Sequence, residues 1–455
     1  MLNIKSEEID TVGKREKYRV SIIGSRQNGV LHACLFAEAG FKVTCVDVNR
    51  VIVGRIMEGS PPFSPGKAKS WLKRNVRNGK LKATNDIKEA VSESDVIVII
   101  CPVKIDKRRR IDHLELERVC KQVGLALPQG SLVIVMSTVR PGTTEGLISE
   151  TFENVSGLKI GYHFGLAYSP IPFLKENSLE ELMTRKRIVA AKDRNSLEAA
   201  STILETITQN GVATTNNVKA AEATRLFKSI QHYVNIALAN ELALLCEKDD
   251  MDYFQIKKLA RTDSAGMFAQ PSVSCENIRE EPRLLLEEAE NLNAKLRIPT
   301  TAIGVNRRIL KHAVDLIKEA LRSCGKSLRT AKISFVGISR TRNAKDIPKS
   351  STRKLAETLE AKGCKVSLYD PYLTGKKLID LGYRFHRRLG DAMKGVDCIV
   401  ILTGHSRLRR LSLEKFKVLG RMPAAVVDLE GILEPDKVEA KGLTYRGLGR
   451  GVRKE

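Results

Sequence analysis

The chain has 455 residues, of which 42% are hydrophobic and 29% charged. This length exceeds what one hydrophobic core supports, so two or three globular domains are expected. No apolar run is long enough to span a membrane, and the N-terminus lacks the apolar core of a signal peptide. The nine cysteines are scattered without metal-type spacing, which predicts reduced thiols in a cytoplasmic protein with no metal site.

The formal net charge of +24 implies affinity for anions, either phosphorylated small molecules or nucleic acid. The basic residues gather in short runs at residues 107–110, at Arg387 and Arg388, and at Arg407, Arg409 and Arg410. Aromatic residues are only 5% of the chain and are not interleaved with these runs, which argues against a platform for single-stranded nucleic acid. General surface basicity is the preferred interpretation, and nucleic acid is not an expected partner.

The first strand-helix-strand pattern is typical of a dinucleotide-binding fold. Residues 18–24 form a β-branched run that ends in Gly24, and the strand after the next helix ends near Asp47. Gly24 and Gly29 suit a tight turn against a pyrophosphate, and Asp47 suits the ribose hydroxyls of NAD. Arg26 occupies the position of the middle glycine of this fingerprint, so we expect its side chain to weaken NAD binding.

A loop rich in hydroxyl groups, residues 137–145, lies between a later strand and a helix. Hydroxyls and free amides at a helix start suit a phosphate, a ribose or a reacting oxygen, which makes Ser137 and Thr138 candidates for cofactor contacts. Simple capping of the helix by Thr143 or Thr144 explains the same residues. Taken alone, the loop favours capping.

Residues 218–248 contain neither proline nor glycine and predict one long helix. Beyond Val234 its apolar residues surround the whole helix, which predicts a spine between two domains and a homodimer built on it and on the helix after Pro299. A second series of strands and helices follows. The predicted parts are a polar tail (residues 1–15), an NAD-type domain (16–212), a central helical and dimerisation domain (213–325) and a second α/β domain (326–455).

Five sequence strings together resemble the nucleotide-sugar 6-dehydrogenase family, which includes UDP-glucose and UDP-N-acetylmannosamine dehydrogenases. The strings lie at residues 137–145, 234–247, 369–372, 399–405 and 442–450. The resemblance implies an α/β fold of two doubly wound, parallel-sheet, Rossmann-like domains joined by a helical middle with the long spine helix. It also implies NAD as cofactor, a UDP-sugar as substrate, and oxidation of the sugar C6 alcohol to a carboxylate through a cysteine thioester.

The catalytic positions implied by this resemblance carry unusual residues. Arg225 stands at the family's lysine position, Ser229 at the asparagine, and Asn277 at the cysteine nucleophile. Cys275 lies two residues too early, unless a local bulge brings it into place. Glu281 stands at the aspartate position.

One of two further acids is replaced in the stretch near Ile171, while Glu176 retains the other, and Thr138 keeps its family position. In the second domain, Arg342 ends a stretch that replaces Phe-Lys-Pro, and Glu430 replaces an arginine that contacts UDP. Substitutions concentrated at the site favour a catalytically impaired homologue. The alternatives are an active NAD-dependent dehydrogenase with altered chemistry, and a non-catalytic nucleotide-sugar or polyanion binder or partner subunit.

Overall fold

The structure is a computed structural model, and it falls into two compact units. The first unit comprises residues 1–230 and 280–295, and the second comprises residues 231–279 and 296–455. The predicted three-part division stays a prediction, because its central part is shared between these units. The residues described are 4, 6–60, 67–105, 111–172, 179–260, 268–273, 280–340, 342–343, 350–373 and 382–451.

The first unit is built on an eight-stranded sheet with the order β10-β9-β8-β7-β4-β1-β2-β3. Neighbouring strands are parallel, except that β8 meets β9 at one antiparallel pair, Tyr168 with Ala190. A separate antiparallel pair joins β5 to β6. The strands are β1 (Arg19–Ile23), β2 (Lys42–Val46), β3 (Leu81–Thr84), β4 (Val96–Ile99), β5 (Lys104–Ile105), β6 (Ile111–Asp112), β7 (Leu132–Val135), β8 (Gly165–Tyr168), β9 (Arg187–Ala190) and β10 (Val212–Thr215).

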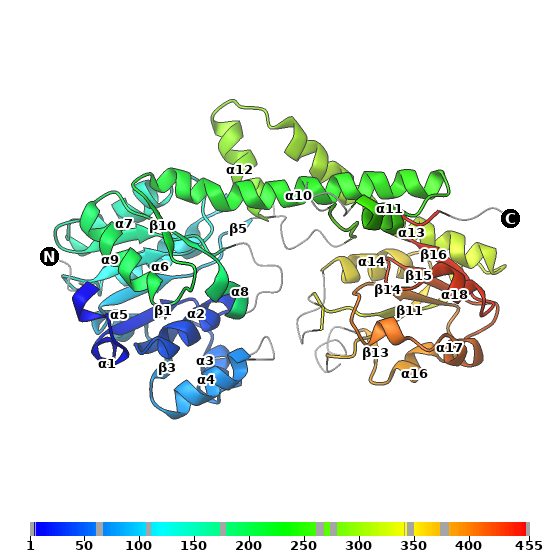
Figure 1. Cartoon of the computed structure of the whole chain (residues 1–455), viewed down its shortest axis with the longest axis horizontal. Coiled ribbons are helices and arrows are strands. Elements are labelled where there is room, and N and C mark those ends of the chain that lie inside the picture. The colour runs from blue at the N-terminus through cyan, green and yellow to red at the C-terminus, as the bar shows by residue number, and fades with distance from the viewer. Residues whose placement is uncertain are drawn as a thin grey trace. The chain divides into compact units, whose positions relative to one another are not determined.

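Helices cover both faces of this sheet (Figure 1). The helices of this unit are α1 (Val12–Arg15), α2 (Gln27–Glu38), α3 (Arg50–Met57), α4 (Lys67–Arg77), α5 (Ile87–Ser92), α6 (Leu114–Gly124), α7 (Ser149–Ser156), α8 (Leu179–Thr184), α9 (Arg194–Glu205) and α12 (Glu280–Asn291), with short turns η1 (Ser6–Glu8) and η2 (Thr144–Ile148).

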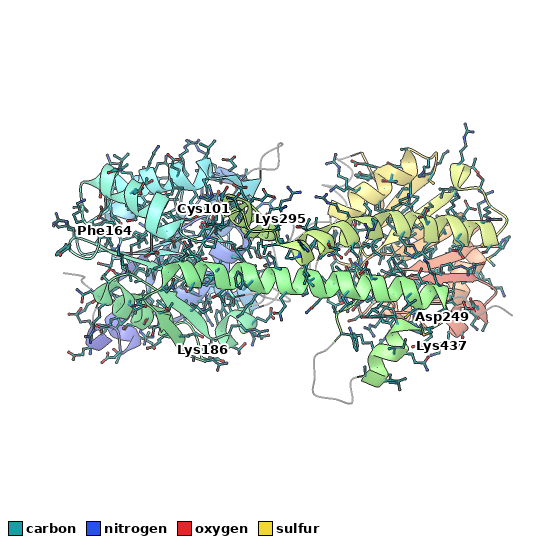
Figure 2. The ribbon with its side chains drawn as sticks, turned by 90° about the horizontal axis from the view of Figure 1, so that it is seen from above. Cys101, Phe164, Lys186, Asp249, Lys295 and Lys437 are labelled. Carbon is teal, nitrogen blue, oxygen red and sulfur yellow. The ribbon has the colours of Figure 1, made fainter. Side chains whose placement is uncertain are left out.

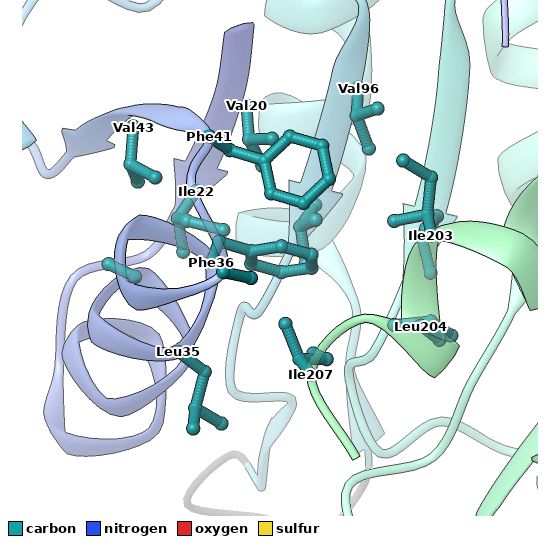
Figure 3. Close-up of a cluster of buried hydrophobic side chains, with 14 of the residues drawn as sticks. Val20, Ile22, Leu35, Phe36, Phe41, Val43, Val96, Ile203, Leu204 and Ile207 are labelled. Atoms are coloured by element: carbon teal, nitrogen blue, oxygen red, sulfur yellow. The ribbon is translucent and has the colours of Figure 1, made fainter. Parts of the chain in front are cut away.

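Alternate residues of each central strand feed two separate cores, as expected for a sheet buried on both faces. Val96 and Val98 belong to one core, and Ile97 and Ile99 belong to the other. Figure 3 shows the first core, where strand residues pack against α2 and against residues 203–207 at and just beyond the end of α9. Ile9, from the predicted polar tail, is buried in the same core, so this segment adds a packed element to the domain.

The second unit contains a six-stranded sheet with the order β13-β12-β11-β14-β15-β16, and all its neighbouring strands are parallel. The predicted fold class, two parallel α/β sheets with helices between them, is confirmed. The strands are β11 (Lys332–Val336), β12 (Lys365–Tyr369), β13 (Arg384–His386), β14 (Cys398–Ile401), β15 (Ala425–Asp428) and β16 (Thr444–Gly447). The helices are α11 (Tyr253–Leu259), α13 (Arg297–Ser323), α14 (Ser350–Glu360), α16 (Leu389–Met393), α17 (Leu413–Leu419) and α18 (Pro435–Glu439), with turns η5 (Leu328–Thr330) and η6 (Leu408–Arg410).

The predicted long helix is α10 (Val218–Lys248), a single helix of 31 residues. It ends just before Asp249, which Figure 2 labels at the end of the unbroken ribbon. Its residues up to Ile230 belong to the first unit, and those from Gln231 belong to the second. No helix in the described part of the chain is long and apolar enough to cross a membrane.

Candidate active site

The turn after β1 is shaped by two glycines. Gly24 has φ of +102°, and a Cβ atom at this position would lie 2.2 Å from the carbonyl oxygen of Ile100. A Cβ atom on Gly29 would lie 1.9 Å from the carbonyl oxygen of Gly24. Both positions therefore require glycine, as a phosphate-binding turn does. Arg26 is the residue immediately before α2, and its exposed side chain makes no capping hydrogen bond to the helix.

Asp47 directly follows β2 and reaches back to this turn. Its carboxylate accepts hydrogen bonds from the backbone N–H of Ser25 at 3.1 Å and of Asn49 at 2.9 Å. The side chain is partly exposed, which leaves carboxylate lone pairs for ribose hydroxyls. The structure thus brings Gly24, Gly29 and Asp47 together, as the strand-helix-strand pattern predicts.

Ser137 and Thr138 lie beyond the end of β7. The buried Ser137 hydroxyl accepts a hydrogen bond from the backbone N–H of Cys101 at 2.9 Å and donates to the carbonyl of Ile99 at 3.3 Å. This hydroxyl therefore joins the ends of β4 and β7. Burial raises the pKa of the Cys101 thiol to about 12, so this cysteine is a packed, protonated side chain. Thr138 is partly exposed at the same strand end, and its role stays a prediction.

The loop at residues 137–145 is held by the spine helix, so the prediction of capping by Thr143 or Thr144 is wrong. The Thr143 hydroxyl donates to the carbonyl of Arg140 at 2.7 Å. Glu222 instead accepts hydrogen bonds from the backbone N–H of Gly142 and, at 2.8 Å, of Thr144. Glu222 is fully buried, and this burial raises the pKa of its carboxyl despite the bonds it accepts. Sequence reasoning missed this residue because its partners lie about 80 positions away.

Three of the predicted catalytic positions meet between α10 and α12. Arg225 and Ser229 are one helical turn apart on α10, so they share a face of that helix. The Arg225 Nη2 atom lies 2.6 Å from Glu281 Oε1, and the Ser229 hydroxyl donates to the other carboxylate oxygen of Glu281. Arg225 and Glu281 side chains are only 16% and 17% exposed. Arg225 also donates to the carbonyl of Ile171 at 3.5 Å.

This arrangement is a nearly buried ion pair in which Glu281 is bonded to two residues of α10. The Glu281 carboxylate accepts one hydrogen bond from the Arg225 guanidinium and one from the Ser229 hydroxyl. These two donor groups are therefore occupied before any ligand binds. Asn277, Cys275 and Glu176 lie outside the described residues.

Two hydroxyl groups remain unsatisfied near this ion pair. The side-chain oxygens of Tyr168 and Ser169 are buried and have no hydrogen-bond partner among the described residues. Burial raises the pKa of Tyr168 far above its usual value, and the charges of Glu222, Arg225 and Glu281 also act on it. Such orphaned groups are rare in protein interiors and mark a place where a polar ligand or water completes the bonding.

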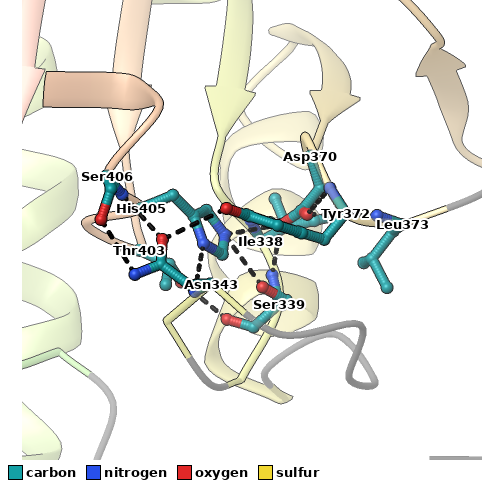
Figure 4. Close-up of polar contacts among 9 residues, drawn as sticks. All are labelled: Ile338, Ser339, Asn343, Asp370, Tyr372, Leu373, Thr403, His405 and Ser406. Atoms are coloured by element: carbon teal, nitrogen blue, oxygen red, sulfur yellow. Dashed lines mark hydrogen bonds and ion pairs between the residues drawn. The ribbon is translucent and has the colours of Figure 1, made fainter. Parts of the chain in front are cut away.

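The second unit repeats the glycine and acid layout. Gly337 follows β11 with φ of +72°, and a Cβ atom there would lie 2.3 Å from the carbonyl oxygen of Thr403. Asp370 follows β12 and accepts hydrogen bonds from the backbone N–H of Ile338, Ser339 and Tyr372 at 2.8 to 2.9 Å (Figure 4).

His405 completes the bonding of Asp370, with its Nε2 atom 3.1 Å from the carboxylate. Its Nδ1 atom accepts from the backbone N–H of Asn343 at 2.9 Å, so the ring proton is on Nε2. Burial alone would raise the pKa of Asp370, but the bonds from His405, Ser339 and Tyr372 lower it overall.

The two substitutions noted in the second domain contact one another. Arg342 forms an ion pair with Glu430 and donates to the side-chain oxygen of Gln270 at 3.1 Å. Gln270 in turn donates to the carbonyl of Glu430 at 2.9 Å. A carboxylate and a cation that the sequence shows as separate departures therefore neutralise each other.

Models of the UDP-glucose/GDP-mannose dehydrogenase family match the chain in three consecutive parts. The NAD binding domain matches residues 18–208, the central domain 219–308 and the UDP binding domain 334–435. The chain belongs to this family. Its first unit is an NAD-binding domain, and Gly24, Gly29 and Asp47 fit a dinucleotide.

No cluster of His, Cys, Asp or Glu that could hold a metal occurs among the described residues.

Individual relatives are similar along nearly the whole chain. The UDP-N-acetyl-D-mannosamine dehydrogenase of Pyrococcus horikoshii is 27% identical over 438 residues, covering 95% of this chain and 99% of the relative. A solved structure of that enzyme matches with a TM-score of 0.86 at 26% identity, covering 95% and 99% of the two chains. A UDP-glucose dehydrogenase structure from Pyrobaculum islandicum has a TM-score of 0.84 at 23% identity, covering 95% and 98%, and shares the fold.

Proposed function

We propose that this chain is an NAD-dependent UDP-sugar dehydrogenase homologue whose oxidation chemistry is impaired. The family reaction, as for UDP-N-acetylmannosamine, requires a nucleophile that forms a thioester and donors aimed at the developing oxyanion. By the motif resemblance, Asn277 stands at the position of the family's cysteine nucleophile. An amide nitrogen forms no thioester, so the second oxidation has no covalent intermediate to proceed through.

The observation that carries this proposal is the ion pair between Arg225 and Glu281. A lysine can lose its proton when its pKa is lowered, whereas arginine stays charged and cannot exchange protons with the substrate. Glu281 also neutralises the positive charge that would stabilise an oxyanion. A donor already bonded to a carboxylate at 2.6 Å must break that bond before it serves the reaction.

The second unit supports the same interpretation. Arginine and lysine suit a diphosphate, whereas a carboxylate repels it. Glu430 stands at the position where relatives carry an arginine, and it already holds Arg342. We expect UDP-sugars to bind more weakly than in active members of the family.

A non-catalytic partner subunit or nucleotide-sugar binder is the second candidate function. It is supported by the contrast between intact framework contacts, such as the hydrogen bond from the backbone N–H of Ser25 to Asp47, and catalytic positions that are bonded to one another. Such a protein would bind NAD or a UDP-sugar without turnover.

A thermal-shift series with NAD, NADH, UDP and UDP-sugars separates these candidates. A ligand at a hundred times its dissociation constant stabilises the native state by about 2.7 kcal/mol, which is readily detected. Binding without turnover supports the second candidate. Binding accompanied by NADH formation would show that the chain is an active dehydrogenase. The same series is measured on a variant that carries Asn277→Cys, Arg225→Lys and Ser229→Asn together. The three changes are combined because restoring one member of a catalytic unit recovers little activity.

We also propose a homodimer, whose contact includes the second-unit part of α10. Leu238 and Leu245 are seven residues apart on one face of the helix, and they are 52% and 54% exposed. Apolar residues with this spacing pair well with a second copy of the same helix. Sedimentation velocity at micromolar concentration should show a dimer that Leu238→Asp dissociates. A monomer in the unmodified protein contradicts this proposal.

A further inference from the structure

The helical layer over one face of the second sheet carries an unusual concentration of positive charge. Residues 384–421 contain ten lysines and arginines and three acids, in a chain whose whole net charge is +24. Helices α16 and α17, both orange in Figure 1, lie in this layer with the turn η6. We call its exposed cations the basic layer; they are Arg384, Arg387, Arg388, Lys394, Arg407, Arg409, Arg410, Lys415 and Lys417.

The fold forces these side chains outward. In η6, Leu408 is buried in the core while Arg409 and Arg410 are exposed. In α17, Phe416 is fully buried, and its neighbours Lys415 and Lys417 are exposed. The apolar residues anchor each element to the sheet, so the cations between them share the outer surface.

Two contacts place individual cations of the basic layer against neighbouring elements. A Cβ atom on Gly390, in the first turn of α16, would lie 3.3 Å from the side-chain nitrogen of Lys415 on α17. Lys415 therefore covers the start of α16, next to Arg388. The guanidinium of Arg407 lies 5.2 Å from the centre of the Tyr372 ring.

Two of the three acids of this segment are paired with cations outside the basic layer, and the third, Asp391, is exposed on α16 and forms no ion pair with a described residue. Asp397 is buried and pairs with Lys326 and with Arg421 at the end of the segment. Glu414 pairs with Lys441 from outside the segment. Among the described residues, no carboxylate lies within ion-pair distance of any cation of the basic layer. Like charges held together repel, so the layer is complementary to an anion that spans several of them.

We propose that the basic layer binds the phosphate backbone of a duplex nucleic acid without reading its sequence. Six of the nine cations are arginines, whose planar guanidinium matches phosphate oxygens in pairs. Duplex contacts need no aromatic platform, so the scarcity of aromatic residues does not oppose them. An anionic membrane fits less well, because it needs an apolar helix face and the layer exposes large apolar groups only at Val418 and Met422.

The experiment uses the full chain and a fluorescent 20-base-pair DNA duplex, followed by anisotropy at 50, 100 and 200 mM salt. About four phosphate contacts give a logarithmic salt slope near −3.6, and binding weakens about 100-fold across this range. Arg387→Glu with Arg388→Glu, and Arg409→Glu with Arg410→Glu, should each weaken binding at least about tenfold and flatten the slope.

The matched control is Lys318→Glu with Arg322→Glu, which changes the net charge equally on the exposed face of α13 in the same unit. It should change binding less than about threefold. Equal losses in all three variants overturn the proposal in favour of general basicity. So does absence of duplex binding, preference for a single strand of the same length, or binding only to phosphatidylglycerol vesicles. Circular dichroism confirms that each variant is folded.

Discussion

The two α/β units place an acid at the same point of their folds but use it differently. Asp47 follows the second strand of the first sheet, is partly exposed and accepts two backbone hydrogen bonds. Asp370 follows the corresponding strand of the second sheet, is buried, and is bonded to four backbone N–H groups and to His405. The first acid keeps capacity for a ligand, whereas the second holds its own turn together.

The two units also share a feature, since each has an ion pair at a position where the resemblance implies a ligand contact. Arg225 with Glu281 is nearly buried, and Arg342 with Glu430 is more exposed, at 42% for the arginine side chain. A similar framework can therefore persist while residues at positions where the resemblance implies ligand contacts pair with one another. Four predictions test this comparison, from the largest expected effect to the smallest.

Asp370→Asn should destabilise the second unit by about 3 kcal/mol, because it leaves buried N–H donors facing an amide that cannot accept from all of them. The matched Asp47→Asn should cost less than about 1 kcal/mol. Urea unfolding followed by far-ultraviolet circular dichroism measures both. The pKa of Asp370 is lowered on folding, so Asp370 contributes to the free energy of unfolding above its unfolded pKa. This contribution is lost as pH falls through the folded pKa. Equal costs for the two variants would remove the distinction between the acids.

Glu281→Gln should destabilise the first unit by about 3 kcal/mol, because it leaves the Arg225 guanidinium buried without its counter-charge. Glu430→Gln should cost about 1 kcal/mol, since Arg342 is better solvated. The same unfolding experiment compares them. A smaller loss for Glu281→Gln than for Glu430→Gln would show that the first ion pair is not tightly held.

Asp428 provides a pH test within the second unit. Burial raises the pKa of this carboxyl to about 6, although the hydrogen bonds that it accepts from the N–H groups of Leu433 and Glu430 act to lower the pKa. The folded state therefore binds more protons than the unfolded state, so stability falls as pH rises from about 4 to 6, by up to about 3 kcal/mol. In Asp428→Asn, the melting temperature measured between pH 4 and 7 should no longer show this fall in stability. An unchanged pH dependence would mean that Asp428 is ionised in the folded protein.

Arg26→Gly should tighten NAD binding by about tenfold, or about 1.4 kcal/mol, because a side chain leaves the place where the pyrophosphate approaches the turn. Calorimetric titration of NAD measures the change, with Arg50→Gly on the exposed start of α3 as the control. Weaker binding in Arg26→Gly would show that the arginine contacts the phosphate.

Local sequence patterns predict much of this fold, because strand, turn and helix signals are short-range. The run ending at Gly24 and the acid at Asp47 could be placed together, since one strand-helix-strand unit contains both. The bond of Glu222 to the loop at Gly142 could not be predicted, because it depends on where a distant helix packs. Arg342 and Glu430 were each identified as departures, but their pairing depends on tertiary structure that no local pattern encodes.

The most direct test of the impaired chemistry is NADH formation at 340 nm by the unmodified protein. The substrates are UDP-glucose, UDP-N-acetylglucosamine and UDP-N-acetylmannosamine, each with saturating NAD. With Arg225 bound to Glu281 and asparagine at position 277, we predict no conversion to the uronate. Two NADH per sugar would contradict the account, and loss of that activity in Cys275→Ser would identify the earlier cysteine as the nucleophile.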